Sequence, residues 1–177
     1  DSNSVLAKER FERMIFYDTS KLKDILVCPP TYKKLSIKNT NSDQNTSAKF
    51  LTVCRLAPNK KIEDTIELFY EYNKLDANSQ LTIIGSSGET FYRDFLIQKI
   101  KNLKIDSKIK MIDLVSAPKL IEHYQESNFY ITMSEHEGFG IPLLEAASYG
   151  CLICAYQLEA YEDIIKNSGF LFNQKNF

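Results

Sequence analysis

Two acidic residues, Glu137 and Glu145, bracket the segment of this sequence whose residue types are best suited to chemistry. Gly138 and Gly140 lie between them, followed by Pro142. Proline fits the first turn of a helix, because the N–H that it lacks would be unpaired there. Free N–H groups and the helix dipole at such a start attract anions, and carboxylates accept hydrogen bonds from sugar hydroxyls. The segment therefore suits a ligand that carries both phosphate and sugar.

Two basic residues follow the end of another predicted strand. Arg55 comes directly after the apolar run 50–54, and Lys60 opens the next predicted helix. Arginine can clamp phosphate oxygens with two hydrogen bonds, and lysine adds a point charge. Ligands of open α/β folds bind where the carboxyl ends of parallel strands converge. We expect Arg55, Lys60 and the turn 137–142 to face one crevice; the alternative is that both cations are solvated loop charges.

An alternation of apolar runs and amphipathic stretches predicts the elements that must position these residues. Strands are expected at residues 50–54, 81–84, 108–112, 129–133, 151–155 and 170–172. Helices are expected at about residues 60–73, 89–103, 120–124, 142–148 and 161–165. Repeated strand–helix units indicate a parallel sheet with helices on both faces. The chain is therefore predicted to be an α/β protein with a Rossmann-like parallel sheet, although it has no G-x-G-x-x-G motif.

The first part of the chain does not follow this alternation. Pro29 and Pro30 end a short strand-like run, and residues 38–47 are a polar stretch with too few apolar side chains to pack. We predict that residues 1–47 are the tail of a preceding domain and an interdomain linker. Residues 48–177 are predicted to form the ligand-binding domain.

Composition excludes several other classes of protein. The 22 basic and 23 acidic residues give a net charge of −1, which does not favour nucleic-acid binding. No apolar run approaches the roughly 20 residues of a membrane span. The N-terminal residues do not resemble a signal peptide, and no cysteine pattern argues for secretion. We therefore expect a cytoplasmic protein.

Two further patterns are typical of metal sites. Cys151 and Cys154 form a C-x-x-C, but they lie in a run that reads as a buried strand, where residues three apart face opposite sides. We interpret them as core residues. Glu135, His136 and Glu137 have the acid-x-acid form of metal-dependent sugar transferases, which however prefer paired aspartates and another fold. No metal site is predicted.

The sequence resembles a known family through several short elements. These are, in chain order, residues 28–30 as a linker between domains, the Arg-Leu-x3-Lys element 55–60, residues 81–85, residues 115–116, and residues 134–150 with an E-x7-E core. Together they resemble the retaining family-4 glycosyltransferases, which have the GT-B fold. The resemblance covers about residues 48–172 and implies that they are the donor-binding C-terminal half of that fold.

The resemblance implies a catalytic role for three residues. Arg55 and Lys60 would hold the diphosphate of a nucleotide-sugar donor and stabilise charge on the leaving nucleoside diphosphate. Glu137 would contact hydroxyls of the transferred sugar, which would pass to the acceptor with retained anomeric configuration. Neither a cofactor nor an obligatory metal is implied.

Further donor contacts are carried over from the same family. Glu145 would accept hydrogen bonds from the ribose hydroxyls. Backbone N–H groups of Gly138, Phe139 and Gly140 would contact the sugar and the phosphates. The main chain near Val115 would contact the base.

The implied reaction also needs an acceptor. A glycan or lipid-linked acceptor would be bound by an N-terminal domain that this chain lacks, so we expect no transfer by the chain alone. The complete protein would work in the cytoplasm, in peripheral contact with the inner membrane face, in the synthesis of a polysaccharide or glycolipid. This expectation follows from the resemblance, not from composition.

The sequence departs from the family at several glycines. Other residues stand at the usual glycine positions: Cys54, Lys61, Asp113, Glu159 and Ala160. These replacements leave two alternatives open. One is a GT-B nucleotide-sugar epimerase, and the other is a non-catalytic nucleotide-binding module.

Overall fold

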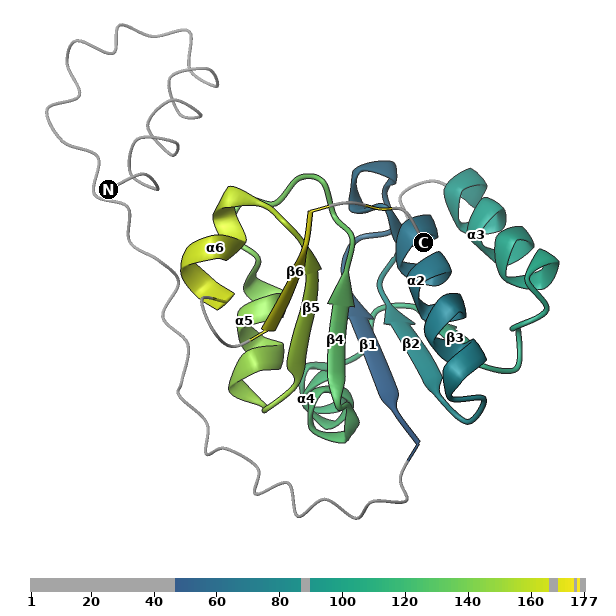
Figure 1. The fold of residues 1–177 in the computed structure, drawn as a ribbon, viewed down its shortest axis with the longest axis horizontal. Helices are drawn as coiled ribbons and strands as arrows, with labels where there is room; N and C mark the ends of the chain where they lie inside the picture. The colour runs from purple at the N-terminus through teal and green to yellow at the C-terminus, as the bar shows by residue number, and fades with distance from the viewer. Residues whose placement is uncertain (1–46, 87–89, 166–168, 174, 176–177) are drawn as a thin grey trace, which may run out of the picture. The chain divides into compact units, whose positions relative to one another are not determined.

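The computed structural model describes residues 47–86, 90–165, 169–173 and 175 (Figure 1). The predictions for residues 1–46, including the linker, lie outside the described residues. Six strands form one sheet in the order β3-β2-β1-β4-β5-β6, and every pair of neighbours is parallel. This confirms the predicted α/β fold with a Rossmann-like parallel sheet.

The strands and helices lie close to their predicted positions. The strands are β1 Lys49–Val53, β2 Gln80–Ile84, β3 Ile109–Ile112, β4 Phe129–Thr132, β5 Leu152–Tyr156 and β6 Gly169–Phe172. The helices are the 3-10 turn η2 Pro58–Lys60, α2 Ile62–Leu75, α3 Thr90–Asn102, α4 Ala117–Glu126, α5 Ile141–Ser148 and α6 Glu159–Ile165. None of the described helices is long and apolar enough to cross a membrane.

The order of the strands places a switch point beside β1. From β1 the chain adds β2 and then β3 on one side, and it returns through α4 to place β4 on the other side of β1. The connections after β1 and after β4 therefore leave the sheet in opposite directions. In open α/β sheets a crevice forms outside the carboxyl ends of the strands at such a point.

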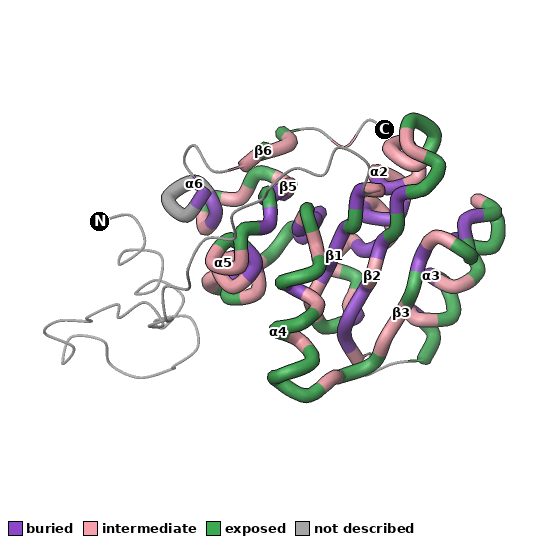
Figure 2. The backbone as a smooth tube through the Cα atoms, turned by 90° about the horizontal axis from the view of Figure 1, so that it is seen from below, coloured by how far each residue is buried: buried purple, intermediate pink, exposed green. Residues whose placement is uncertain are grey.

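Helices pack on both faces of the sheet through the alternation of strand side chains. Phe50 of β1 joins the core under α2 and α3, and its neighbour Leu51 joins the core under α4, α5 and α6. Figure 2 shows the buried positions along β1 and β2 at the centre of the sheet. Cys151 belongs to the second core and Cys154 packs against the first, as the strand interpretation predicted.

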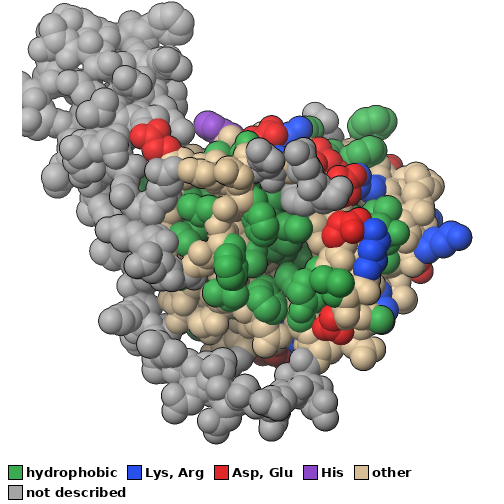
Figure 3. Space-filling view, viewed as in Figure 1, with side chains coloured by type: hydrophobic (Ala, Val, Ile, Leu, Met, Phe, Trp, Pro, Cys, Tyr) green, Lys and Arg blue, Asp and Glu red, His purple; other side chains and the backbone are tan. Residues whose placement is uncertain are grey.

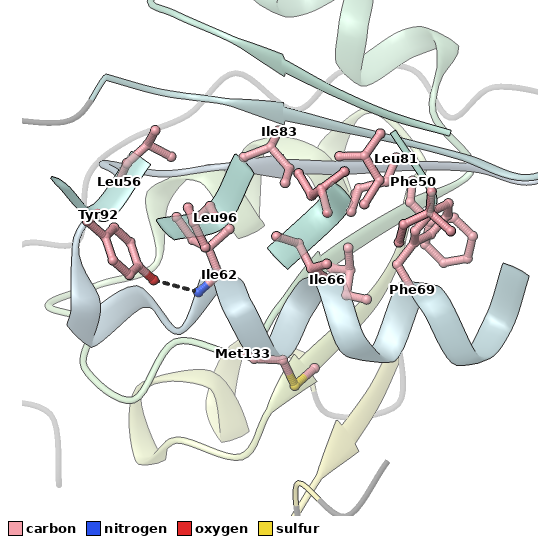
Figure 4. Close-up of a cluster of buried hydrophobic side chains, with 14 of the residues drawn as sticks. Phe50, Leu56, Ile62, Ile66, Phe69, Leu81, Ile83, Tyr92, Leu96 and Met133 are labelled. Carbon is pink, nitrogen blue, oxygen red and sulfur yellow. Dashed lines mark hydrogen bonds between the residues drawn. The ribbon is translucent and has the colours of Figure 1, made fainter. Parts of the chain in front are cut away.

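The first core holds the start of α2 in place (Figure 4). Ile62, Ile66 and Phe69 face the sheet from α2, with side chains that are fully buried. The N–H of Ile62 donates a hydrogen bond of 3.1 Å to the Tyr92 hydroxyl of α3. That hydroxyl in turn donates to the carboxylate of Glu63. The end of α2 that follows η2 is therefore anchored to α3, which fixes the loop after β1.

The first face is only partly covered. No helix of the described residues packs over β5 and β6 on the side of α2 and α3, and Figure 3 shows hydrophobic side chains gathered there. Phe170 of β6 is 60% exposed and Leu152 of β5 is 38% exposed. The expected cover of helices on both faces is therefore incomplete over β5 and β6.

Candidate functional site

A cleft of about 170 Å³ opens at the carboxyl edge of the sheet, at the switch point between β1 and β4. Its walls are formed by ten residues: Val53, Cys54, Arg55, Lys60, Tyr130, Glu137, Gly140, Pro142, Leu143 and Tyr161. Four of the residues singled out in the sequence for catalysis or donor binding are among them. The structure therefore brings Arg55, Lys60 and the turn after β4 into one crevice, as the sequence predicted.

Hydrogen bonds to backbone carbonyls join the loops on the two sides of the cleft. The N–H of Glu135 donates to the carbonyl of Asn59 at 3.0 Å. From the other side, the Lys60 ammonium donates to the carbonyl of His136 at 3.0 Å. These contacts connect η2 to the loop after β4, two segments more than 70 residues apart in sequence. The position of Lys60 thus depends on both loops.

Lys60 and Glu137 form an ion pair inside the cleft. The ammonium lies 2.6 Å from Oε1 of the carboxylate, and the two side chains are 14% and 17% exposed. Cys54 lies in the same wall, where burial raises the pKa of its thiol to about 12. Lys60 opposes that rise and Glu137 adds to it. The thiol is therefore neutral near pH 7, and the Lys60 ammonium is engaged by a carboxylate.

Arg55 differs from Lys60 in its surroundings. It is exposed at the mouth of the cleft, and no carboxylate of the described residues forms an ion pair with it. An arginine keeps its charge at any physiological pH and presents several N–H donors. Arg55 can therefore meet an anion without first giving up an ion pair within the described part of the chain.

Lys61 adopts a backbone conformation that favours glycine, the residue expected at this position from the resemblance. Its φ is 48° and its ψ is 48°, in the left-handed region that favours glycine. Its ammonium lies 3.7 Å from a carboxylate oxygen of Glu135. The left-handed turn between η2 and α2 is thus kept without the glycine.

The acids of the Glu135-His136-Glu137 segment are held by separate lysines. Glu135 pairs with Lys175 at 3.0 Å and Glu137 with Lys60 at 2.6 Å, while His136 is exposed and does not line the cleft. Lys175 and Lys61 lower the pKa of Glu135, chiefly through the hydrogen bond from Lys175. No group of three or more metal-ligating side chains occurs among the described residues. Both acids of this segment therefore form ion pairs with lysines.

Gly140 ends the turn and caps α5 with its backbone. Its φ is 69°, and its carbonyl accepts hydrogen bonds from the N–H groups of Leu143 and Leu144 at 3.0 and 3.1 Å. A Cβ at this position would lie 2.7 Å from the ring of Tyr161, which is 1% exposed. A glycine is therefore required by both the backbone conformation and the packing.

We predict that Gly140→Ala destabilises the chain by about 2 kcal/mol, through left-handed strain and contact with the Tyr161 ring. Gly138→Ala is the matched control, because a Cβ there meets nothing within 4 Å. It should leave the free energy of unfolding within about 0.5 kcal/mol of the unmutated value. Urea unfolding of the three proteins measures both effects. Equal stability of Gly140→Ala and Gly138→Ala would contradict this account of the turn.

Four residues predicted to bind the donor lie outside the walls of this cleft. Gly138 is exposed and Phe139 is half-buried in the turn. Val115 precedes α4 and packs against the second core. Glu145, in α5, accepts a hydrogen bond of 2.9 Å from the Tyr124 hydroxyl of α4. Of the predicted phosphate and sugar contacts, the structure thus gathers Arg55, Lys60, Glu137 and Gly140 in the cleft. Gly138, Phe139 and the predicted ribose and base contacts lie outside its walls.

Sequence reasoning did not assign some of the cleft residues. Tyr161 and Tyr130 line the cleft, whereas the sequence pattern predicts only a helix and a strand at their positions. Tyr130 donates a hydrogen bond of 3.0 Å to the carbonyl of Val53, which joins β4 to the end of β1. Burial, followed by the nearby Glu137, raises the pKa of Tyr161. No sequence signal distinguishes these tyrosines from the others in the chain.

A parallel sheet with a polar cleft at its switch point defines a Rossmann-like ligand-binding domain. The profile of the family described as "Glycosyl transferases group 1" matches residues 21–177. Because this match covers most of the chain, the protein belongs to the group 1 glycosyltransferases.

Similar sequences include a peptide N-acetylglucosaminyltransferase subunit and a mannosyltransferase. The chain is 32% identical over 126 residues to the UDP-N-acetylglucosamine–peptide N-acetylglucosaminyltransferase GtfA subunit of Limosilactobacillus reuteri. The aligned region covers 71% of this chain and 22% of that protein. It is 27% identical over 125 residues to the serotype-specific mannosyltransferase WbdA of Escherichia coli. That alignment covers 70% of this chain and 15% of WbdA. The chain thus spans less than a quarter of the length of both relatives.

Solved structures show the same fold. The S. aureus TarM structure with UDP superposes with a TM-score of 0.67 at 18% identity, over 73% of this chain and 26% of that one. The pneumococcal O-GlcNAc transferase GtfA, in complex with UDP and GlcNAc, gives a TM-score of 0.61 at 22% identity, over 73% and 25% of the two chains. At these identities the likeness establishes the GT-B type of fold, and it does not assign a ligand.

Proposed function

We propose that residues 48–177 are the donor-binding domain of a retaining hexosyltransferase that uses a nucleoside diphosphate sugar. The observation that carries this proposal is the placement of Arg55, Lys60 and Glu137 in one cleft at the switch point of the sheet. Two cations and an acid suit a ligand that joins a diphosphate to a sugar. Membership of the glycosyltransferase family supports the same ligand.

In this proposal, the diphosphate lies between Arg55 and Lys60. The guanidinium of Arg55 binds two phosphate oxygens, and the ammonium of Lys60 balances the charge that grows on the leaving group. These two cations do the work that a metal ion does in other transferases, so no metal is required. The backbone N–H groups of Gly138, Phe139 and Gly140, ahead of α5, add donors to the phosphates and the sugar.

The remaining parts of the donor are assigned to the acids and to the loop before α4. Glu137 accepts hydrogen bonds from hydroxyls of the sugar, and Glu145 accepts them from the ribose. The main chain near Val115 contacts the base. The bond between the anomeric carbon and the phosphate oxygen breaks, and its electron pair leaves with the nucleoside diphosphate. The acceptor hydroxyl attacks the anomeric carbon from the same face and gives its proton to the departing phosphate. Because attack and departure share one face, the anomeric carbon retains its configuration.

The acceptor in this proposal is a glycan or a lipid-linked sugar, bound by a further domain of the complete protein. The reaction would take place in the cytoplasm, at the inner face of the membrane.

An epimerase or a non-catalytic binding module would behave differently in one assay. Release of nucleoside diphosphate by the complete protein only when acceptor is present supports transfer. Isomerisation of the donor without acceptor would identify an epimerase, and no turnover would identify a binding module.

The proposal predicts that Arg55→Ala weakens nucleotide binding by ten-fold or more. Loss of a hydrogen-bonded charge contact is worth about 1.5–3 kcal/mol, which corresponds to roughly ten-fold or more in affinity. Calorimetric titration of the chain with UDP, GDP and ADP measures the effect and identifies the base. Lys101→Ala removes the same charge from an exposed site on α3 and should leave affinity unchanged. The proposal fails if no nucleotide binds, or if both variants lose affinity equally.

A further inference from the structure

Tyr124 connects α4 to the carboxylate that we assign to the ribose. Its hydroxyl donates a hydrogen bond of 2.9 Å to Oε2 of Glu145. The Tyr124 side chain is 1% exposed, whereas Glu145 is only half-buried. A buried donor that reaches a partly exposed carboxylate restricts the orientation of that carboxylate, because moving it would leave the hydroxyl unpaired. Oε1 is then the oxygen best placed to accept a hydrogen bond from a ligand.

Two contacts fix Tyr124 itself. Its ring stacks on that of Tyr149, with centroids 5.6 Å apart and planes 5° from parallel. Its carbonyl accepts a hydrogen bond from the thiol of Cys151 at 3.3 Å. Burial and then the charge of Glu145 raise the pKa of the Tyr124 hydroxyl, so it remains a donor at physiological pH. Tyr124 is therefore held by two residues that do not line the cleft, Tyr149 and Cys151.

The geometry points to Tyr124 as a positioning residue for ribose recognition: its hydroxyl holds Oε2 of Glu145 so that Oε1 accepts the ribose hydroxyls. This inference rests on the proposed function, since it requires a ribose beside α5. Tyr124 does not touch the ligand, and its effect passes through Glu145 alone. Removing its hydroxyl should therefore matter only for nucleotides with ribose hydroxyls, and only while Glu145 is present.

The test is calorimetry with whichever of UDP, GDP and ADP binds the unmutated chain most tightly, and with its 2′,3′-dideoxy form. Tyr124→Phe keeps the ring stacked on Tyr149 and removes only the hydroxyl. We expect it to weaken binding of the ribose nucleotide about five-fold and to leave binding of the dideoxy form unchanged. In a Glu145→Ala background, Tyr124→Phe should have no additional effect.

Tyr92→Phe is the matched control, because Tyr92 is also a buried tyrosine whose hydroxyl donates to a glutamate, Glu63, under the opposite face of the sheet. It should lower stability, and any change in affinity that it causes through the loop after β1 should be equal for the ribose nucleotide and its dideoxy form. Equal losses for both nucleotides in Tyr124→Phe would make Tyr124 a merely structural residue and overturn the inference, as would no loss at all. Failure of the unmutated chain to bind any nucleotide would instead sink the proposed function, and the role of Tyr124 with it.

Discussion

Glu137→Gln is expected to strengthen the binding of nucleoside diphosphate while it weakens sugar transfer. The Lys60 ammonium is paired with this carboxylate at 2.6 Å. A diphosphate must draw the ammonium away from Glu137 and bind beside its negative charge. The amide of glutamine removes both obstacles. A partly exposed ion pair contributes about 1 kcal/mol, so the affinity for nucleoside diphosphate should rise about five-fold.

Turnover should change in the opposite direction. In the proposed mechanism the Glu137 carboxylate contacts sugar hydroxyls as charge develops at the anomeric carbon. Loss of such an electrostatic contact typically costs about 100-fold in rate. Transfer by the complete protein should therefore fall about 100-fold in Glu137→Gln, measured as release of nucleoside diphosphate in the presence of acceptor.

Glu135→Gln is the matched control for this pair of measurements. It makes the same change two residues earlier in the turn, at a side chain that is 48% exposed and pairs with Lys175. It should leave the affinity for nucleoside diphosphate unchanged. Weaker binding by Glu137→Gln alone would mean that the carboxylate holds Lys60 in its binding position, which would reverse the competition inferred here.

Gly85→Ala is expected to destabilise the chain more than any other change considered. Gly85 follows β2, and its N–H donates to the carbonyl of Ile112 at 2.9 Å. A Cβ at Gly85 would lie 1.8 Å from the carbonyl oxygen of Cys54 and 2.9 Å from its carbonyl carbon. Both atoms belong to the backbone, so no side-chain rotation relieves the overlap, and the ends of β1 and β2 must move apart.

The expected loss of stability is about 3 kcal/mol. For a domain of this size it corresponds to a fall in Tm of about 10 °C, which calorimetric or circular-dichroism melting measures. Nucleotide affinity should fall too, because Cys54 and Arg55 belong to the displaced segment. Gly138→Ala, which adds a methyl group where nothing lies within 4 Å, should melt with the unmutated chain. An unchanged Tm for Gly85→Ala would mean that the strand ends separate at little cost.

Much of the fold can be read from this sequence because its signals are local. Apolar runs of four or five residues, each followed by an amphipathic stretch, predict the order of strands and helices. The two glycines before Pro142 predict the turn and the start of α5. Because strands that alternate with helices must run parallel, the same pattern also brings Arg55, Lys60 and Glu137 to one edge of the sheet.

Other features depend on contacts between segments that are distant in sequence. The pairing of Lys60 with Glu137 depends on which strand lies beside β1, and the sequence pattern of each strand is the same whichever neighbour it has. The support of Glu145 by Tyr124 depends on how α4 packs against α5. The part of the sheet over β5 and β6 that no described helix covers likewise appears only when the helices are placed.

The sequence by itself therefore determined the class of fold, the positions of its elements and the residues best suited to bind phosphate and sugar. Each of these follows from side-chain periodicity and turn chemistry within a few residues. Only the tertiary structure decided which charges meet, which tyrosines close the cleft and which glycines cannot be replaced. Tyr161 illustrates the reason: its burial against Gly140 is a packing relation between α6 and the turn after β4, which neither segment specifies alone.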